Sequence, residues 1–146
     1  MSREMKLPGS DHPITIAPSA DHVLVRSGEV TIADSRSTLV MREANYPPVR
    51  YIPLADVDRS LLTPSNLSTY CPYKGDASSY SIIRDQERGA AAVWFYDQPY
   101  PAVAEIKGHV AFYTDRIDLT VSPPIRIRTE QSIGAPAGVT RSTRTM

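Results

Sequence analysis

The 146-residue chain carries sixteen basic and sixteen acidic residues, so its formal net charge is zero. Such a chain has no basic excess with which to attract a nucleic acid or an anionic membrane, and neither is an expected partner. The length suits one domain that buries its core without disulfide or metal staples. The single cysteine, Cys71, excludes an internal disulfide and a cysteine-rich zinc site.

The beginning of the sequence has no apolar run. Met1 leads into the charged residues Arg3, Glu4 and Lys6, which is unlike a secretion signal. No segment approaches the roughly 20 continuous apolar residues that a membrane-spanning helix needs. We therefore expect a soluble protein in the cytoplasm.

Short apolar alternations of period two recur along the chain, and this pattern is typical of half-buried strands. In chain order, the alternating pairs are Ile14 and Ile16, Val23 and Val25, Val30 and Ile32, Leu39 and Met41, Tyr80 and Ile82, Val93 and Phe95, Val110 and Phe112, and Ile117 and Leu119, with Tyr51 also apolar. Ser27-Gly28 reads as a two-residue hairpin turn, and residues 85–89 and 114–116 read as longer turns. The pattern predicts an all-β, mostly antiparallel fold.

Long helices are not expected, because thirteen prolines interrupt almost every helical repeat. Two short helices are predicted, one over residues 56–62, stopped by Pro64, and one over residues 102–107, between Pro101 and Gly108. We expect a flexible N-terminus over residues 1–5, a single all-β domain over 6–121 and a disordered tail over 122–146. The tail is rich in Ser, Pro, Thr, Arg and Gly, which bury little apolar surface.

The densest group of chemically versatile residues lies within residues 67–80. It contains Cys71, Pro72, Lys74 and Gly75 together with three tyrosines. Cys71 is a candidate nucleophile if Lys74 or a histidine such as His109 lowers its pKa, because only the thiolate attacks. The alternative is that Cys71 is a small buried hydrophobic residue. Cys71, Lys74 and His109 are therefore the candidate catalytic residues.

A second candidate is an aromatic pocket around Trp94. On a strand, Trp94 and Tyr96 share one face and Phe95 takes the other. One face should be core, and the other could line a concave pocket, together with tyrosines, for a flat or cationic ligand. Trp94 and Tyr96 are the candidate ligand-binding residues of this segment. The tyrosines considered for this pocket are Tyr51, Tyr73 and Tyr80.

Glu43 and His12 complete the candidate ligand-binding residues. Glu43 is either a buried acid or a surface partner of Arg42 or Arg50. His12, like His109, is either a base or a structural histidine bonded to a backbone group. A metal site built from His12, His109, Cys71 and an acid is conceivable, but no pair of these residues has metal-binding spacing, so a metal is not expected. No other cofactor is expected.

Six motifs give the chain a resemblance to a known family, the domain of unknown function 427 family, from about residue 6 to residue 119. They are Lys6-Leu-Pro-Gly-Ser-Asp-His-Pro-Ile-Thr-Ile16, Tyr46-Pro-Pro-Val-Arg-Tyr-Ile-Pro53, Asp56-Val-Asp58, Cys71-Pro-Tyr-Lys-Gly75, Ala92-Val-Trp-Phe-Tyr96 and Ile106-Lys-Gly-His-Val-Ala-Phe-Tyr113. The resemblance implies a β-tent-like fold of two antiparallel sheets meeting at an angle, grouped with type B methionine sulfoxide reductases and the cereblon ligand-binding domain. Those relatives usually hold zinc with four cysteines, which this chain does not have.

The family also carries a nucleotidyltransferase label. That chemistry needs a Gly-Ser loop for phosphates followed closely by two carboxylates for magnesium. Gly9-Ser10 is far in sequence from Asp56 and Asp58, and Asp56 is better explained as the start of a short helix.

Three classes of function are compatible with these observations: binding, catalysis and assembly. We expect a small-molecule-binding module whose cleft lies beside the Cys71–Gly75 loop. The alternatives are an enzyme that uses Cys71 or a nucleotidyltransferase-type activity, and a scaffold that assembles into oligomers. The identity of the ligand and the oligomeric state are not predicted.

Overall fold

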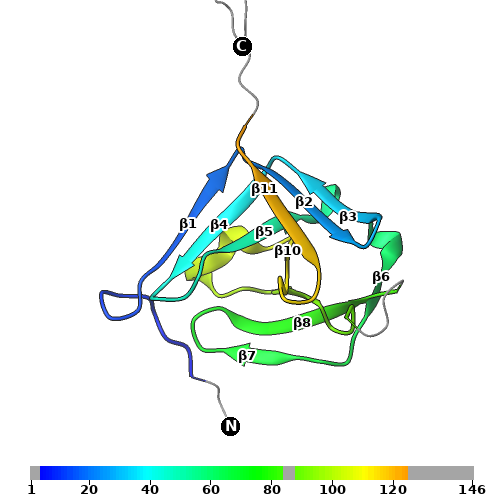
Figure 1. The fold of residues 1–146 in the computed structure, drawn as a ribbon. Coiled ribbons are helices and arrows are strands. Elements are labelled where there is room, and N and C mark those ends of the chain that lie inside the picture. Colours follow the sequence, from blue (N-terminus) through cyan, green and yellow to red (C-terminus); the bar gives the residue numbers. More distant parts are fainter. Residues whose placement is uncertain (1–3, 84–87, 125–146) are drawn as a thin grey trace, which may run out of the picture.

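The computed structural model describes residues 4–83 and 88–124, and its strands form two antiparallel sheets (Figure 1). The larger, eight-stranded sheet has the order β1-β4-β5-β10-β9-β8-β6, and β7 also pairs with β8. Its strands are β1 (Ile14–Ser19), β4 (Thr38–Glu43), β5 (Val49–Pro53), β6 (Leu62–Pro64), β7 (Thr69–Cys71), β8 (Gly75–Ile82), β9 (Val93–Phe95) and β10 (His109–Phe112). The smaller sheet has the order β11 (Asp118–Ser122), β2 (His22–Ser27) and β3 (Val30–Ser35). The expected all-β class with two antiparallel sheets is confirmed.

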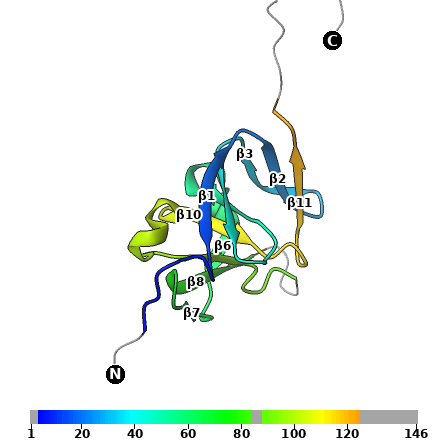
Figure 2. The same cartoon turned by 90° about the vertical axis from the view of Figure 1, so that its left-hand side faces the viewer.

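The core divides into two clusters on opposite faces of the larger sheet. The inter-sheet core joins buried residues of both sheets, among them Val25, Ile32 and Val93. The second core includes Met41 and Tyr51 and is covered by the 3-10 segment η3 (Pro101–Ile106). In Figure 2, η3 and the strands β2, β3 and β11 lie on opposite sides of the molecule.

The alternation along β9 assigns each of its residues to one of these cores. Val93 is buried in the inter-sheet core and Phe95 packs against it, whereas Trp94 and Tyr96 belong to the second core. The predicted separation of Phe95 from Trp94 and Tyr96 is therefore confirmed.

The predicted helix over residues 56–62 is wrong. Two 3-10 turns, η1 (Leu54–Asp56) and η2 (Arg59–Leu61), take its place, and β6 begins at Leu62. Val57, between the turns, is extended and forms an isolated bridge with Ala33, and the Asp58 N–H donates to the Ile32 carbonyl at 2.8 Å. These bonds to β3 hold the chain in a conformation that a continuous helix cannot adopt.

The helix predicted over residues 102–107 is present as η3, although it is a 3-10 segment with a kink at Val103. Gly108 follows its last turn with a φ of +80°, as expected of a glycine at a helix C-terminus.

The predicted turns are reproduced in part. The loop between β2 and β3 consists of Gly28 and Glu29, because Ser27 is still paired with Val30; the prediction was one residue early. Gly28 supplies the positive φ of this turn. The turn over residues 114–116 is confirmed, and most of the turn predicted over 85–89 lies outside the described residues.

The expected ends of the domain are only partly within the described residues. Strand β11 continues to Ser122, and residues 1–3 and 125–146 lie outside the described part of the chain. The tail predicted over 122–146 therefore stays a prediction. Among the described residues, no helix has the length and apolar character to cross a membrane.

Candidate functional site

The hairpin between β7 and β8 positions Lys74. Cys71 pairs with Gly75 across the hairpin, so the loop consists of Pro72, Tyr73 and Lys74. The Lys74 N–H closes the turn by donating to the Cys71 carbonyl at 3.2 Å. Gly75 has a φ of +108°, a conformation that favours glycine, and a Cβ there would lie 3.4 Å from a backbone carbonyl oxygen. The Cys71–Gly75 turn therefore has a structural role, because it fixes the position from which the Lys74 side chain projects.

Glu43, the last residue of β4, receives this lysine. The Lys74 ammonium donates to Glu43 Oε1, and the His12 ring lies 2.8 Å from Glu43 Oε2 through its Nε2 atom. The side chains of Glu43 and Lys74 are only 13% and 12% exposed. His12 in turn stacks on Tyr73, with ring centroids 3.9 Å apart and planes 5° from parallel. Three segments far apart in sequence therefore meet at one carboxylate.

The charge of Glu43 is favoured at this position. Burial by itself raises the pKa of the carboxyl group, but the hydrogen bonds from Lys74 and His12 and the charges of both residues outweigh it, so the pKa is lowered. Glu43 therefore remains a carboxylate at neutral pH. Both of its oxygens already have a hydrogen-bond partner in the protein.

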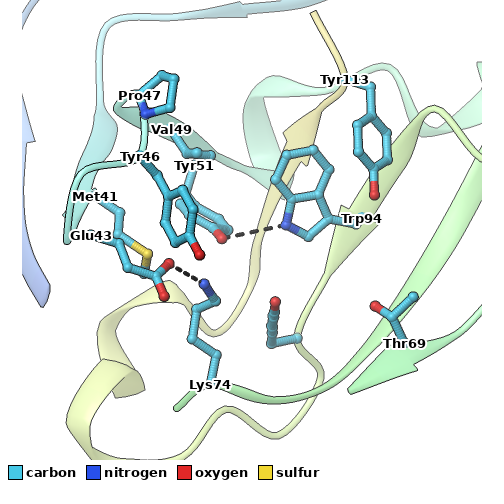
Figure 3. Close-up of a pocket in the computed structure, with 11 residues that line it drawn as sticks. Met41, Glu43, Tyr46, Pro47, Val49, Tyr51, Thr69, Lys74, Trp94 and Tyr113 are labelled. Carbon is cyan, nitrogen blue, oxygen red and sulfur yellow. Dashed lines mark hydrogen bonds and ion pairs between the residues drawn. The ribbon is translucent and has the colours of Figure 1, made fainter. Parts of the chain in front are cut away.

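The Glu43–Lys74 pair forms one wall of a cavity of about 200 Å³ (Figure 3). The remaining walls are mostly aromatic and apolar. The residues that line the cavity are Met41, Glu43, Tyr46, Pro47, Val49, Tyr51, Thr69, Lys74, Trp94, Tyr96 and Tyr113.

Trp94 lies between two tyrosines of this wall. Its ring is 4.5 Å from that of Tyr113 and nearly perpendicular to that of Tyr51, with an interplanar angle of 85°. Its indole N–H donates to the Tyr51 hydroxyl oxygen at 3.4 Å, the second dashed line in Figure 3. The three rings give the cavity flat walls in two orientations.

Two phenol groups of this wall are deeply buried. Tyr51 is 1% and Tyr96 is 6% exposed. Burial, reinforced for Tyr51 by the nearby charge of Glu43, raises the pKa of Tyr51 to about 12, although the hydrogen bond from Trp94 opposes the shift. Burial, followed by the charge interaction with Tyr51, raises the pKa of Tyr96 still further. Both phenols therefore keep their protons at neutral pH.

The cavity continues into an open groove of about 500 Å³. The two share Tyr46, Pro47, Val49, Trp94 and Tyr113 as lining residues. Tyr46 is 64% exposed and Tyr113 is 39% exposed, so these two rings form the mouth of the cavity.

Five of the residues predicted from the sequence are brought together in the lining: Glu43, Tyr51, Lys74, Trp94 and Tyr96. His12 and Tyr73 are not lining residues; they stack on each other and contact the cavity through the bond from His12 to Glu43. The alternative pairing of Glu43 with Arg50 is wrong, because Arg50 binds Asp21 at 3.1 Å.

The structure separates other candidates from the cavity. Tyr80 stacks on Phe95 against the inter-sheet core, on the opposite face of the sheet. His109 begins β10, and its Nδ1 lies 3.0 Å from the Lys107 carbonyl oxygen, the structural alternative considered for it. It is not a lining residue.

Cys71 is half-buried on β7 and is not a lining residue either. It is close enough to Tyr51 and Tyr96 to influence their pKa values. In the described part of the chain, its thiol has no hydrogen bond to Lys74, His12 or His109, which bind other partners. The arrangement expected of an activated thiolate is therefore not formed.

Sequence reasoning did not single out Tyr46, Tyr113, Met41 or Thr69 as lining residues. Tyr46 and Tyr113 occur in the motifs Tyr-Pro-Pro and Gly-His-Val-Ala-Phe-Tyr, and these motifs were the one feature of the sequence that pointed to either residue. Tyr46 lies in the loop between β4 and β5, and Tyr113 directly follows β10; outside strands, alternation does not predict the direction of a side chain.

The carboxylates considered for nucleotidyl transfer have other partners. Asp56 accepts a hydrogen bond from the Ser35 hydroxyl at 2.6 Å. Asp58, rather than Asp56, caps a helical turn, accepting from the Ser60 N–H at 3.2 Å and from its hydroxyl at 2.6 Å. Among residues 4–83 and 88–124, no group of three or more His, Cys, Asp or Glu side chains is placed to hold a metal ion.

Comparison with known proteins agrees with the motifs noted in the sequence. A search of curated proteins found no match. The model of a family described as a domain of unknown function, DUF427, matches residues 15–123, which include all the strands described above except the first residue of β1. The matched region also contains every residue that lines the cavity. The chain therefore belongs to the DUF427 family.

Proposed function

We propose that the chain is a binding module that holds a small molecule in the cavity between Trp94 and the Glu43–Lys74 pair. One observation carries the proposal: a concave, largely aromatic site contains a few converging polar groups from separate segments of the chain. Ligand sites commonly combine apolar walls, which supply contact area, with a few polar groups, which fix orientation.

The volume sets the size of the ligand. An apolar cavity of about 150 Å³ is enough for benzene, so about 200 Å³ suits one substituted ring. A larger ligand would extend past Tyr46 and Tyr113 into the groove. Stacking on Trp94 would then supply much of the contact, since aromatic pairs gain about 0.5–1.5 kcal/mol beyond the area they bury.

The test uses Trp94 itself as the reporter, because it is the only tryptophan in the chain. A library of single-ring compounds is screened by thermal shift, and each hit is titrated against tryptophan emission. A ligand at 100 times its dissociation constant is expected to stabilise the protein by about 2.7 kcal/mol. Its binding is expected to change the emission of Trp94.

The matched variants are Trp94→Leu and Phe95→Leu, which truncate neighbouring aromatic residues on opposite faces of β9. Trp94→Leu is expected to reduce thermal stabilisation by every hit, and Phe95→Leu is expected to preserve it. Hits that stabilise Trp94→Leu as well as the unmodified protein would show that the cavity is not the site.

A further inference from the structure

We propose that the ligand presents carbonyl-type oxygen acceptors, from a carboxylate or a neutral conjugated carbonyl, on a flat ring. This inference rests on the proposed function, because it describes what the same cavity would hold. It is drawn from the polar atoms in the wall.

Tyr96 contributes a buried hydroxyl group to the cavity wall. Tyr96 is 6% exposed and lines the cavity. Within the described residues, however, its hydroxyl group has no hydrogen-bond partner. Buried polar groups in folded proteins are nearly always paired, and each exception calls for an explanation, such as a functional role or a partner supplied by bound water or an ion. The phenol retains its proton, so the missing partner is an acceptor.

Tyr51 adds a second donor. Its oxygen accepts from the Trp94 indole N–H at 3.4 Å, and an indole can only donate. The proton of Tyr51 therefore has no acceptor among the described residues. Tyr51 lies close enough to Tyr96 to contribute to the raised pKa of that phenol, and both residues belong to the lining.

Lys74 adds further hydrogen-bond donors and a positive charge to the cavity wall. An ammonium group has three protons, and among the described residues the Lys74 ammonium donates only to Glu43. Both oxygens of Glu43 already have hydrogen-bond partners. The positive charge of a cationic ligand would therefore be repelled by the Lys74 ammonium and would find no carboxylate oxygen without a partner at Glu43. An oxygen acceptor would instead complete the bonds of Lys74, Tyr51 and Tyr96 together.

The test compares four probes built on one ring: toluene, benzoate, benzamide and benzylammonium. Dissociation constants are measured by ligand-observed NMR with the full chain. Benzoate or benzamide is expected to bind at least about tenfold more tightly than toluene and benzylammonium, the effect of one or more buried hydrogen bonds. Tighter binding of benzoate would assign a carboxylate, and tighter binding of benzamide would assign a neutral carbonyl.

Tyr96→Phe is the decisive variant, with Tyr80→Phe as its control on the opposite face. Tyr96→Phe is expected to weaken the tighter acceptor probe by about tenfold and to leave toluene unchanged. Tyr80→Phe is expected to change neither. Binding of the acceptor probe that is equal in both variants, or tightest binding of benzylammonium, would overturn the inference.

These failures are distinct from failure of the proposed function. If toluene binds as tightly as the acceptor probes and Trp94→Leu weakens all of them, the ligand class is wrong and the cavity remains a binding site. If probes bind and Trp94→Leu weakens none of them, both proposals are wrong.

Discussion

Removing one oxygen atom, in Tyr96→Phe, is expected to leave the free protein as stable as before or more stable. The hydroxyl of Tyr96 is buried and has no partner among the described residues. Most losses of a buried hydrogen-bonding group destabilise a protein, because a partner is left unpaired. Here no protein partner is left behind, so this penalty is absent.

The magnitude follows from the cost of burying a hydroxyl without a hydrogen bond, which mutational data place at about 1–3 kcal/mol. Solvent in a cavity of about 200 Å³ would satisfy part of that requirement. We therefore expect the free energy of unfolding to rise by about 0–2 kcal/mol.

Tyr70→Phe is the matched control, because the same atom is removed from a hydroxyl that is bonded. The Tyr70 hydroxyl lies 2.7 Å from the Tyr100 hydroxyl and donates to the Glu4 carbonyl. Its loss is expected to lower the free energy of unfolding by about 0.5–1.5 kcal/mol. The two variants should thus differ in sign.

Urea unfolding at pH 7 without ligand, followed by Trp94 emission and far-ultraviolet circular dichroism, measures both free energies. Equal slopes against urea would show that the compared transitions expose similar surface. If Tyr96→Phe destabilised the protein by as much as Tyr70→Phe, the Tyr96 hydroxyl would have a protein partner, and the argument for an acceptor-bearing ligand would fail.

Three further predictions concern the polar wall and its support. Glu43→Gln is expected to lower the free energy of unfolding at pH 7 by about 1–3 kcal/mol, since the Lys74 ammonium loses its anionic partner. The ordinary pKa of the Glu43 carboxyl group is 4.5, and folding lowers it. The stability that the Glu43 carboxylate contributes is therefore complete above pH 4.5 and is lost as the pH falls through the pKa of the folded state. The difference in free energy of unfolding between wild type and variant, measured by urea unfolding, should shrink at lower pH. Gly75→Ala is expected to cost about 1–2 kcal/mol because of its φ of +108°, whereas Gly9→Ala, which has no positive φ, should cost less in the same assay. Cys71→Ala is expected to leave probe dissociation constants within about twofold, because Cys71 does not line the cavity; a loss of about tenfold or more in NMR titrations would place the thiol at the site.

Some of the site could be predicted because it depends on local periodicity. Side chains alternate along a strand, so Trp94 and Tyr96 had to share a face that excludes Phe95. The loop from Cys71 to Gly75 could also be predicted, since Pro72 restricts and Gly75 widens the available φ values; that this loop joins two paired strands was not predicted. These features need only neighbouring residues.

The contacts of Glu43 could not be predicted in the same way. His12 and Lys74 each lie 31 residues from Glu43, on opposite sides in the sequence. Their meeting depends on the pairing of β1 with β4, which places Ile14 opposite Glu43, and on the separate β7–β8 hairpin. Arg42 and Arg50 are nearer to Glu43 in sequence, but neither binds it. Arg42 is the neighbour of Glu43 on β4 and so points to the opposite face of the sheet. Arg50 binds Asp21 instead.

The short helices failed for a related reason. Residues 56–62 have a helical start signal and a proline stop, which are local features. The backbone bonds of Val57 and Asp58 to β3 are tertiary, and they divide the segment into two turns. Tertiary pairing of this kind regularly overrides weak helix propensity in so short a segment.

The two cores explain how the fold can keep an unsatisfied polar wall. The inter-sheet core is built from apolar side chains of both sheets, including Val23, Val110 and Phe112. The second core instead contains Tyr51 and Tyr96 and adjoins the Glu43–Lys74 pair. Buried donors without acceptors reduce stability, and proteins retain such departures from good packing mainly where function requires them. Because the apolar core stabilises the sheets from one face, the other face can retain donors that only a bound molecule would satisfy.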